Sequence, residues 1–155
     1  MKVGDKVPDF ELSDQDGTPR RLSTLLSAGP VVLFFYPAAM TTGCTKEACH
    51  FRDLAGEFAA VGVQRVGISM DEVSKQKQFS DKHGFDYPLL SDGDGAVAAL
   101  FGVKRGGLGG KLAPVRRATF AIDTDRRVVA AIRSEIDMAA HADRALAALR
   151  NVPRS

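Results

Sequence analysis

Cys44 and Cys49 are the only cysteines of the 155-residue chain, and they lie five positions apart. A cysteine thiolate is a strong nucleophile, and two thiols that can approach one another can form and exchange a disulfide. The pair therefore indicates redox chemistry at a reactive thiol. Free cysteines are also common as small buried apolar residues, so the spacing alone leaves open that both side chains are inert.

Two other uses of paired cysteines fit the chain poorly. A redox pair of the thioredoxin kind has two residues between its cysteines, whereas four separate Cys44 from Cys49. A structural zinc site needs four ligands, and of the histidines His50, His83 and His141 the first alone is near the cysteines in sequence. Cys49 and His50 are adjacent and point in different directions on a helix, so we expect no metal site.

The cysteines are expected at the start of a helix that follows a buried strand. Residues 31–36 (VVLFFY) form a continuous run of β-branched, leucine and aromatic residues, typical of a central strand buried on both faces. The apolar residues that then recur at helical spacing are Phe51, Ala55, Phe58 and Val61. They predict a helix that begins near Gly43 and is capped by Gly62. Cys44 then lies in the first turn, where free N–H groups and the helix dipole stabilise a thiolate.

The same helix limits how the two thiols can meet. Five residues correspond to about 140° around a helix, and the two Cα atoms are then roughly 8–9 Å apart. A disulfide requires Cα atoms closer than about 7 Å. Cys44 and Cys49 can therefore pair only if the first turns of the helix unwind.

The rest of the chain has the pattern of an α/β protein with a mixed sheet. Further strands are expected at residues 65–70 and 87–92, and a hairpin of two strands at residues 117–123 and 126–132. Helices are expected at residues 72–84 with Asp71 as N-cap, at residues 95–103, and after Asp137 with an apolar stripe of Met138, Ala142, Ala145 and Leu149. Residues 104–114 are expected to form a loop. This order of elements predicts helices packed on both faces of one sheet.

Composition places the chain among globular proteins and excludes several classes of function. It is 45% apolar and 26% charged, with a formal net charge of +2, and its length favours a single domain over residues 1–155. No basic stripe stands out, so we expect no nucleic-acid partner. The N-terminus has no apolar signal segment and residues 31–36 are too short to cross a bilayer, so we expect a cytoplasmic protein without membrane contact. Thiols stay reduced there, and a cysteine pair is then more often catalytic than structural.

The residues around the cysteines resemble a known family. Pro37, Thr41 and Cys44 form the pattern P-x-x-x-T-x-x-C, which is similar to the active-site signature of the peroxiredoxins. The following GCTKEACHFRD resembles the Q type, also called bacterioferritin comigratory proteins, in which a second cysteine lies five residues after the first. Residues 4–25, 87–92 and 116–129 extend the resemblance in order over essentially the whole chain.

This resemblance implies a thioredoxin-like fold and a reaction that needs no cofactor. A thiol reduces hydrogen peroxide or organic hydroperoxides, with Cys44 as the peroxidatic residue that becomes a sulfenic acid. Cys49 would resolve that acid as an intramolecular disulfide, which thioredoxin or a similar dithiol would reduce. The resemblance also favours a monomer, and the implied role is antioxidant defence.

The resemblance also assigns four further site residues. Thr41 would donate to the thiolate and the peroxide oxygen, and Pro37 would shield the pocket from water. Arg117 precedes Thr-Phe on a strand, as the family's active-site arginine does, and Glu47 would orient it. Each residue also has an ordinary structural explanation: Thr41 as a helix start, Pro37 as a strand end, Arg117 as a surface cation, and Glu47 as an acidic residue complementing the helix N-terminus.

Two features depart from the family pattern. Thr42 stands where proline is usual, and proline there would preorganise the helix start, so we expect a first turn that melts more easily. Residues 38–40 (AAM) are less polar than the usual loop. This would suit apolar peroxides or the docking of a partner, but neutral drift explains it more simply. Three alternatives remain open: a cycle in which an external thiol replaces Cys49, a redox-sensing binding protein, and a structural module with inert cysteines.

Overall fold

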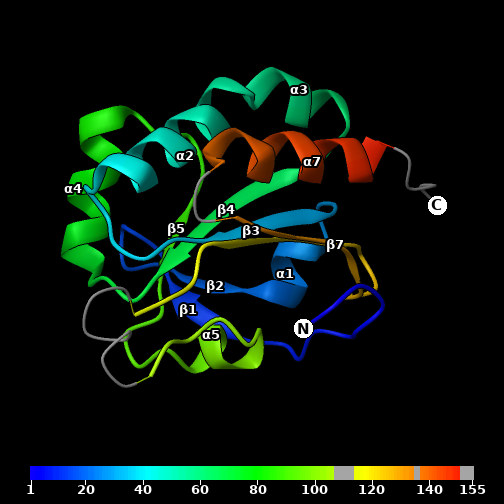
Figure 1. The fold of residues 1–155 in the computed structure, drawn as a ribbon, viewed down its shortest axis with the longest axis horizontal. Coiled ribbons are helices and arrows are strands. Elements are labelled where there is room, and N and C mark those ends of the chain that lie inside the picture. The colour runs from blue at the N-terminus through cyan, green and yellow to red at the C-terminus, as the bar shows by residue number, and fades with distance from the viewer. Residues whose placement is uncertain (107–113, 135–136, 151–155) are drawn as a thin grey trace.

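The computed structural model describes residues 1–106, 114–134 and 137–150. In these residues seven strands form one mixed sheet in the order β2-β1-β5-β4-β3-β6-β7 (Figure 1). The strands are β1 (Glu11–Ser13), β2 (Pro19–Arg21), β3 (Val31–Phe35), β4 (Gln64–Ser69), β5 (Leu89–Ser91), β6 (Ala118–Ile122) and β7 (Val128–Arg133). The helices are α1 (Leu22–Leu26), α2 (Thr42–Asp53), α3 (Ala55–Ala60), α4 (Val73–His83), α5 (Ala96–Leu100) and α7 (Met138–Arg150).

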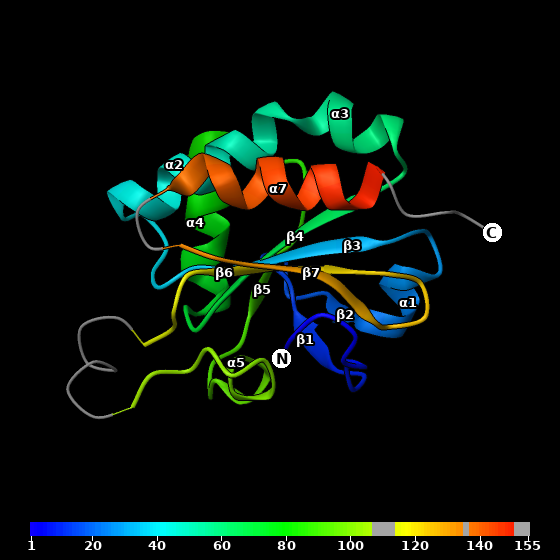
Figure 2. The ribbon, with the colours of Figure 1, turned by 45° about the vertical axis from the view of Figure 1, so that its right-hand side comes forward.

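The helices cover both faces of the sheet, as Figure 2 shows. Helices α2, α3 and α7 lie on one face and α1 and α5 on the other. Each face has its own apolar core, and the first contains Cys44, Phe51 and Phe58 together with buried residues of α7. Among the described residues, no helix has the length and apolar character needed to cross a membrane.

The predicted central strand is confirmed as β3, in which all five residues are buried. It pairs in parallel with β4 and antiparallel with β6, which makes the sheet mixed. Successive side chains of a strand point to opposite faces, so Phe34 enters the core beside α2 while Leu33 and Phe35 enter the other. Strand β3 therefore positions two other segments. The loop that leads into α2 follows β3 directly, and β6 lies beside it.

The long helix predicted up to Gly62 is two helices. Helix α2 ends at Asp53 and α3 begins at Ala55, because the backbone of Leu54 has φ −91° and ψ 17°. The guanidinium of Arg65 donates to the Phe51 carbonyl at 2.9 Å, the group that would accept from Ala55 in an unbroken helix. Phe51 and Phe58 still enter the same core, so the apolar spacing was informative although the helix is interrupted.

Of three other predictions, one is wrong, one is confirmed and one is described only in part. Asp71 is not the N-cap of α4; that residue is Glu72, which makes no side-chain capping bond. Asp137 does cap α7, since its Oδ1 accepts from the Ala140 N–H at 3.1 Å. Of the predicted loop 104–114, Lys104 forms an isolated antiparallel bridge with Val115, and residues 107–113 lie outside the described part.

The hairpin of β1 and β2 was not predicted. Its strands have three residues each and show no apolar alternation. A carboxylate organises the turn instead: Asp14 accepts from the N–H groups of Asp16 and Thr18 and from Nε of Arg20. Side-chain bonds to nearby backbone groups are typical of aspartate in turns.

Candidate active site

Cys44 lies in the first turn of α2, as predicted, and its side chain faces the core. It is 1% exposed, and both it and Cys49 are free thiols. Thr41 is the N-cap residue, with extended backbone and no side-chain capping bond. The sulfur therefore lies at the positive end of the helix, near N–H groups that have no acceptor within the helix.

Arg117 lies against this thiol. It comes directly before β6 and is 6% exposed. Its Nη2 donates to the Cys44 Sγ at 3.2 Å, and its Nη1 donates to Oε1 of Glu47 at 3.1 Å. Burial opposes the charged form, but the negative charges of Glu47 and Cys44 outweigh it and raise the pKa of Arg117 above its ordinary value. The guanidinium is therefore a fixed positive charge at the sulfur.

Glu47 holds the arginine from one turn further along α2. Its side chain is fully buried, and its second oxygen, Oε2, lies 3.7 Å from Nε2 of His141 on α7. Three elements, α2, α7 and the segment before β6, thus meet at one carboxylate. Gly43 makes room for this arrangement, because a Cβ there would lie 3.2 Å from Nη2 of Arg117.

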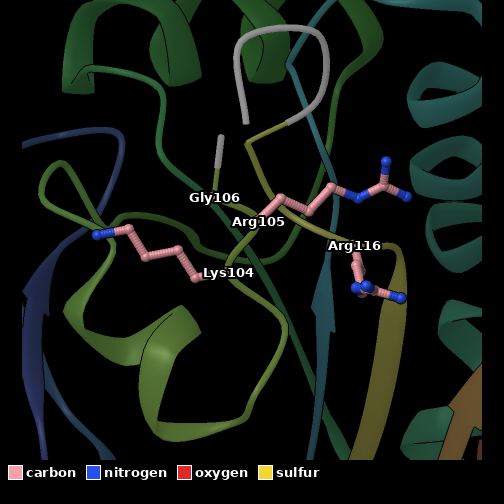
Figure 3. A pocket seen from close by; sticks show the side chains of 4 residues that line it. All are labelled: Lys104, Arg105, Gly106 and Arg116. Carbon is pink, nitrogen blue, oxygen red and sulfur yellow. The ribbon is translucent and has the colours of Figure 1, made fainter. Parts of the chain in front are cut away.

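The structure shows which of the two adjacent arginines contacts Cys44: it is Arg117 and not Arg116. The sequence distinguished them only by the Thr-Phe match. Arg116 is exposed and, with Lys104, Arg105 and Gly106, lines an open pocket (Figure 3). The Lys104 side chain points away from those of Arg105 and Arg116 (Figure 3), and its Nζ donates to the Asp94 carbonyl at 2.9 Å. Arg117 faces Cys44 because alternate residues of an extended strand point to opposite sides.

Thr41 and Pro37 lie in the loop between β3 and α2. The Thr41 hydroxyl is exposed and donates to the Ala38 carbonyl at 2.8 Å. Pro37 is half-buried at the end of β3. Met40 has φ +71°, a left-handed conformation that is unusual for a long side chain, and its side chain is 38% exposed. The loop is thus tightly turned, and Thr41 is its last residue before α2.

Asp71 anchors this loop, a role that the sequence did not reveal. Its Oδ2 accepts from the Ala39 N–H at 2.7 Å and from the Ser69 hydroxyl at 2.7 Å. Gln76 donates to Ser69 and accepts from the hydroxyl of Tyr36, the last residue before the loop. The available signal was positional: β3 and β4 are parallel, so the residues that follow them meet at one edge of the sheet.

Cys49 lies on another side of α2. It is partly buried at the margin of the core. Its neighbour Arg52 has a raised pKa, chiefly because of its hydrogen bond to Asp53. The structure thus brings Cys44, Glu47 and Arg117 together, places Thr41 and Pro37 in the adjoining loop, and leaves Cys49 apart from Cys44 on the folded helix.

Sequence and structure comparisons identify the family. A sequence model of the AhpC/TSA family matches residues 3–131. A Mycobacterium tuberculosis protein named as a peroxiredoxin is 70% identical over 152 residues, 98% of each chain. The Escherichia coli peroxiredoxin Bcp is 39% identical over 130 residues, 83% of each chain. The chain is a peroxiredoxin of the Q type.

Solved structures agree with this assignment. The crystal structure of peroxidoxin BcpB from Mycobacterium tuberculosis matches this peroxiredoxin with a TM-score of 0.94 and 69% identity, covering 99% of each chain. Peroxiredoxin Q of Xanthomonas campestris matches with a TM-score of 0.81 and 37% identity over 91% of this chain and 89% of that one. The predicted thioredoxin-like fold is confirmed, and the protein is a thiol-dependent peroxidase.

Proposed function

We propose that this peroxiredoxin reduces hydrogen peroxide and organic hydroperoxides at Cys44. The thiolate would attack one peroxide oxygen, the O–O bond would break, and the departing oxygen would take a proton and leave as water or an alcohol. Cys44 would then carry a sulfenic acid. The observation that supports this most directly is the 3.2 Å contact between the Arg117 guanidinium and the Cys44 sulfur.

The surrounding groups suit the charge that this step develops. Negative charge moves from the sulfur to the departing oxygen, and donors held in place before the reaction stabilise it. Arg117 and the backbone N–H groups at the start of α2 are such donors, and Glu47 keeps the guanidinium oriented. We assign Thr41 to the peroxide oxygen, which requires its hydroxyl to turn from the Ala38 carbonyl, and Pro37 to the exclusion of water.

Cys49 is the proposed resolving residue. Its thiol would attack the sulfur of the Cys44 sulfenic acid, forming a disulfide and releasing water. On the folded helix the two thiols are too far apart, so the first turns of α2 would unwind. Thr42, the exposed first residue of α2, would make that easier than the proline usual in the family.

The disulfide of the proposed cycle needs an external reductant. An external dithiol, with thioredoxin as the expected one, would return the disulfide to two thiols by exchange. Organic substrates are supported by a relative of known structure, the bacterioferritin comigratory protein of Xanthomonas campestris, for which alkyl peroxide reduction activity is described. The exposed Met40 and the apolar residues beside it would suit such substrates. We further propose a cytoplasmic monomer.

One experiment tests the cysteine roles. The reduced protein and its Cys49→Ser variant are each given one equivalent of hydrogen peroxide, and free thiols and intact mass are measured. The expected result is loss of two hydrogens in the wild type and a trappable sulfenic acid in the variant. Retention of both thiols by the wild type would overturn the proposal and favour inert cysteines.

The same variants separate the remaining alternatives. Sustained turnover of Cys49→Ser with thioredoxin would favour a cycle in which an external thiol resolves the sulfenic acid. Oxidation of the wild type without turnover by any dithiol would favour a redox-sensing role.

A further inference from the structure

His141 is a buried histidine that the proposed cycle does not use. It lies in the first turns of α7 with a fully buried side chain. Its Nδ1 is 2.8 Å from the Thr119 hydroxyl and its Nε2 is 2.7 Å from the Ser134 carbonyl. A carbonyl can only accept, so Nε2 carries a hydrogen and donates to Ser134, while Nδ1 is hydrogen-bonded to the Thr119 hydroxyl. The two contacts fix the orientation of the ring.

The edge of this ring that carries the Nε2 hydrogen lies close to Glu47. The distance from Nε2 to Oε2 is 3.7 Å, which is too long for a good hydrogen bond but short for two polar groups. Both side chains are fully buried, where the interaction between the N–H dipole and a carboxylate is stronger than in water. His141 therefore favours the ionised carboxylate in the position that the structure shows.

The other oxygen of Glu47 determines where the guanidinium points. Oε1 accepts from Nη1 of Arg117, and Nη2 of Arg117 donates to Cys44. Arg117 and Thr119 are two positions apart on extended backbone and so face the same side. Contacts therefore run without a break from Thr119 through His141, Glu47 and Arg117 to the sulfur.

We propose that His141 is a positioning residue for the reaction of Cys44 with peroxide. It fixes the Glu47 carboxylate through Oε2, the oxygen that does not accept from Nη1 of Arg117, and it thereby holds the guanidinium against the sulfur. This proposal rests on the proposed peroxidatic role of Cys44. It gives α7 a part in the chemistry, since α7 supplies the group that supports the arginine without touching the thiol.

The test measures the rate at which peroxide oxidises Cys44 in a Cys49→Ser background, where resolution does not follow. His141→Leu fills the space of the ring with an apolar side chain of moderate size and removes the ring N–H. We expect it to lower the second-order rate constant about tenfold, as for the loss of other groups that support a reacting centre. His141→Gln can present an amide N–H to Ser134 and Glu47, so it should recover most of the rate.

Two controls separate positioning from stability. Leu149→Ala removes a buried side chain from the far end of α7 and should lower the unfolding midpoint without changing the oxidation rate. In a Glu47→Gln background, His141→Leu should slow oxidation by less than about twofold, because its target is already changed.

The outcomes are distinguishable. Equal rates for His141→Leu and the parent, or the same loss with Glu47 and with Gln at that position, would overturn the positioning role. A rate loss in Leu149→Ala matching that of His141→Leu would also overturn it, since stability alone would then explain both. Failure of the parent itself to form a sulfenic acid would instead refute the proposed role of Cys44.

Discussion

Arg117 contacts its two neighbours through different nitrogens of one planar guanidinium group. Nη2 reaches the sulfur of Cys44 and Nη1 reaches Glu47. A lysine ammonium is a compact point charge and cannot reproduce this fork. Arg117→Lys should therefore lower the rate constant for peroxide roughly a hundredfold, the typical loss when a preorganised donor is removed. Stopped-flow oxidation of the reduced protein measures it.

The adjacent arginine provides the matched control. Arg116 is exposed, whereas Arg117 is buried against the Cys44 sulfur, so Arg116→Lys should react at the parent rate. If both variants lost the same amount, the loss would not depend on the two contacts that the Arg117 guanidinium makes, and the proposed role of its forked geometry would be wrong.

At the scale of elements, the start of α2 must be both ordered and able to unwind. Thr41 has φ −79° and ψ 157°, the extended conformation favoured before proline, and the next position is the first of the helix, where proline is tolerated. Thr42→Pro should thus raise the free energy of unfolding by about 0.4–1 kcal/mol. Disulfide formation should slow by roughly two- to fivefold, because unwinding becomes harder.

Two separate rates test this variant. Peroxide oxidation of Cys44 should keep the parent rate, since it occurs on the folded helix, while the later mass loss that marks the disulfide is delayed. An unchanged delay would mean that the first turn of α2 does not limit resolution, and the expectation for Thr42 would be dropped.

Asp71 couples the end of β4 to the active-site loop. Its carboxylate accepts from the Ala39 N–H, and Ala39 is 2% exposed. Asp71→Ala leaves this buried donor without that acceptor, so we expect unfolding to become about 1–3 kcal/mol easier. The loop leading to Cys44 would also shift, and peroxide oxidation should slow. Chemical denaturation and stopped-flow oxidation measure the two effects.

The next residue is a natural control for this prediction. Glu72 is exposed and is the N-cap of α4 without a side-chain capping bond. Glu72→Ala should therefore change neither stability nor rate by a comparable amount. Equal effects of both substitutions would point to the helix terminus, and not the Ala39 contact, as the origin.

The elements that the sequence predicted well are those in which one local pattern dominates. Residues 31–36 are apolar throughout, and residues 31–35 form β3. Gly62, predicted to cap the helix, has φ +67° after α3. The interruption at Leu54 depends on Arg65, a residue eleven positions later, so no local pattern reveals it. The β1–β2 hairpin depends on Asp14 side-chain bonds in a chain segment without apolar alternation.

In the site, too, the residues that belong to a sequence motif were predicted, whereas a residue that acts through a tertiary contact was not. Cys44, Glu47 and Arg117 were identified by a resemblance and are found together. His141 was noted only as a histidine far from the cysteines. Its place three positions after Met138 and four before Ala145, two apolar stripe residues of α7, would have predicted burial, but its contact with Glu47 follows from the packing of α7 against α2.

At the scale of the whole molecule, the sheet separates the site from the second core. Cys44 belongs to the core shared by α2, α3, α4 and α7, whereas α1 and α5 pack on the other face. The reacting residues come from segments far apart in sequence, with 73 positions between Cys44 and Arg117. Links that tie distant segments on the α2 side of the sheet therefore stabilise the frame in which the site is assembled.

The bidentate pair of Arg65 and Asp86 is such a link. Arg65 on β4 donates to both carboxylate oxygens of Asp86, at 2.9 and 2.8 Å, and also to the Phe51 carbonyl of α2. The hydrogen bonds to Arg65 outweigh burial and lower the pKa of Asp86 below its ordinary value of 3.8. A carboxyl with a lowered pKa stabilises the fold above its ordinary pKa, and the stabilisation is lost as the pH falls through the folded value.

Asp86→Asn should therefore be less stable than the parent at neutral pH, by less than about 1 kcal/mol because half of the Asp86 side chain is exposed to solvent. The difference should persist down to about pH 4 and then shrink as the parent's carboxyl is protonated. Urea unfolding of both proteins between pH 7 and pH 2.5 measures it, and high salt at pH 7 should reduce it as well. A difference that stayed constant over this range would mean that Asp86 contributes through packing or hydrogen bonding alone, because a contribution from its charge must disappear when the carboxyl becomes neutral.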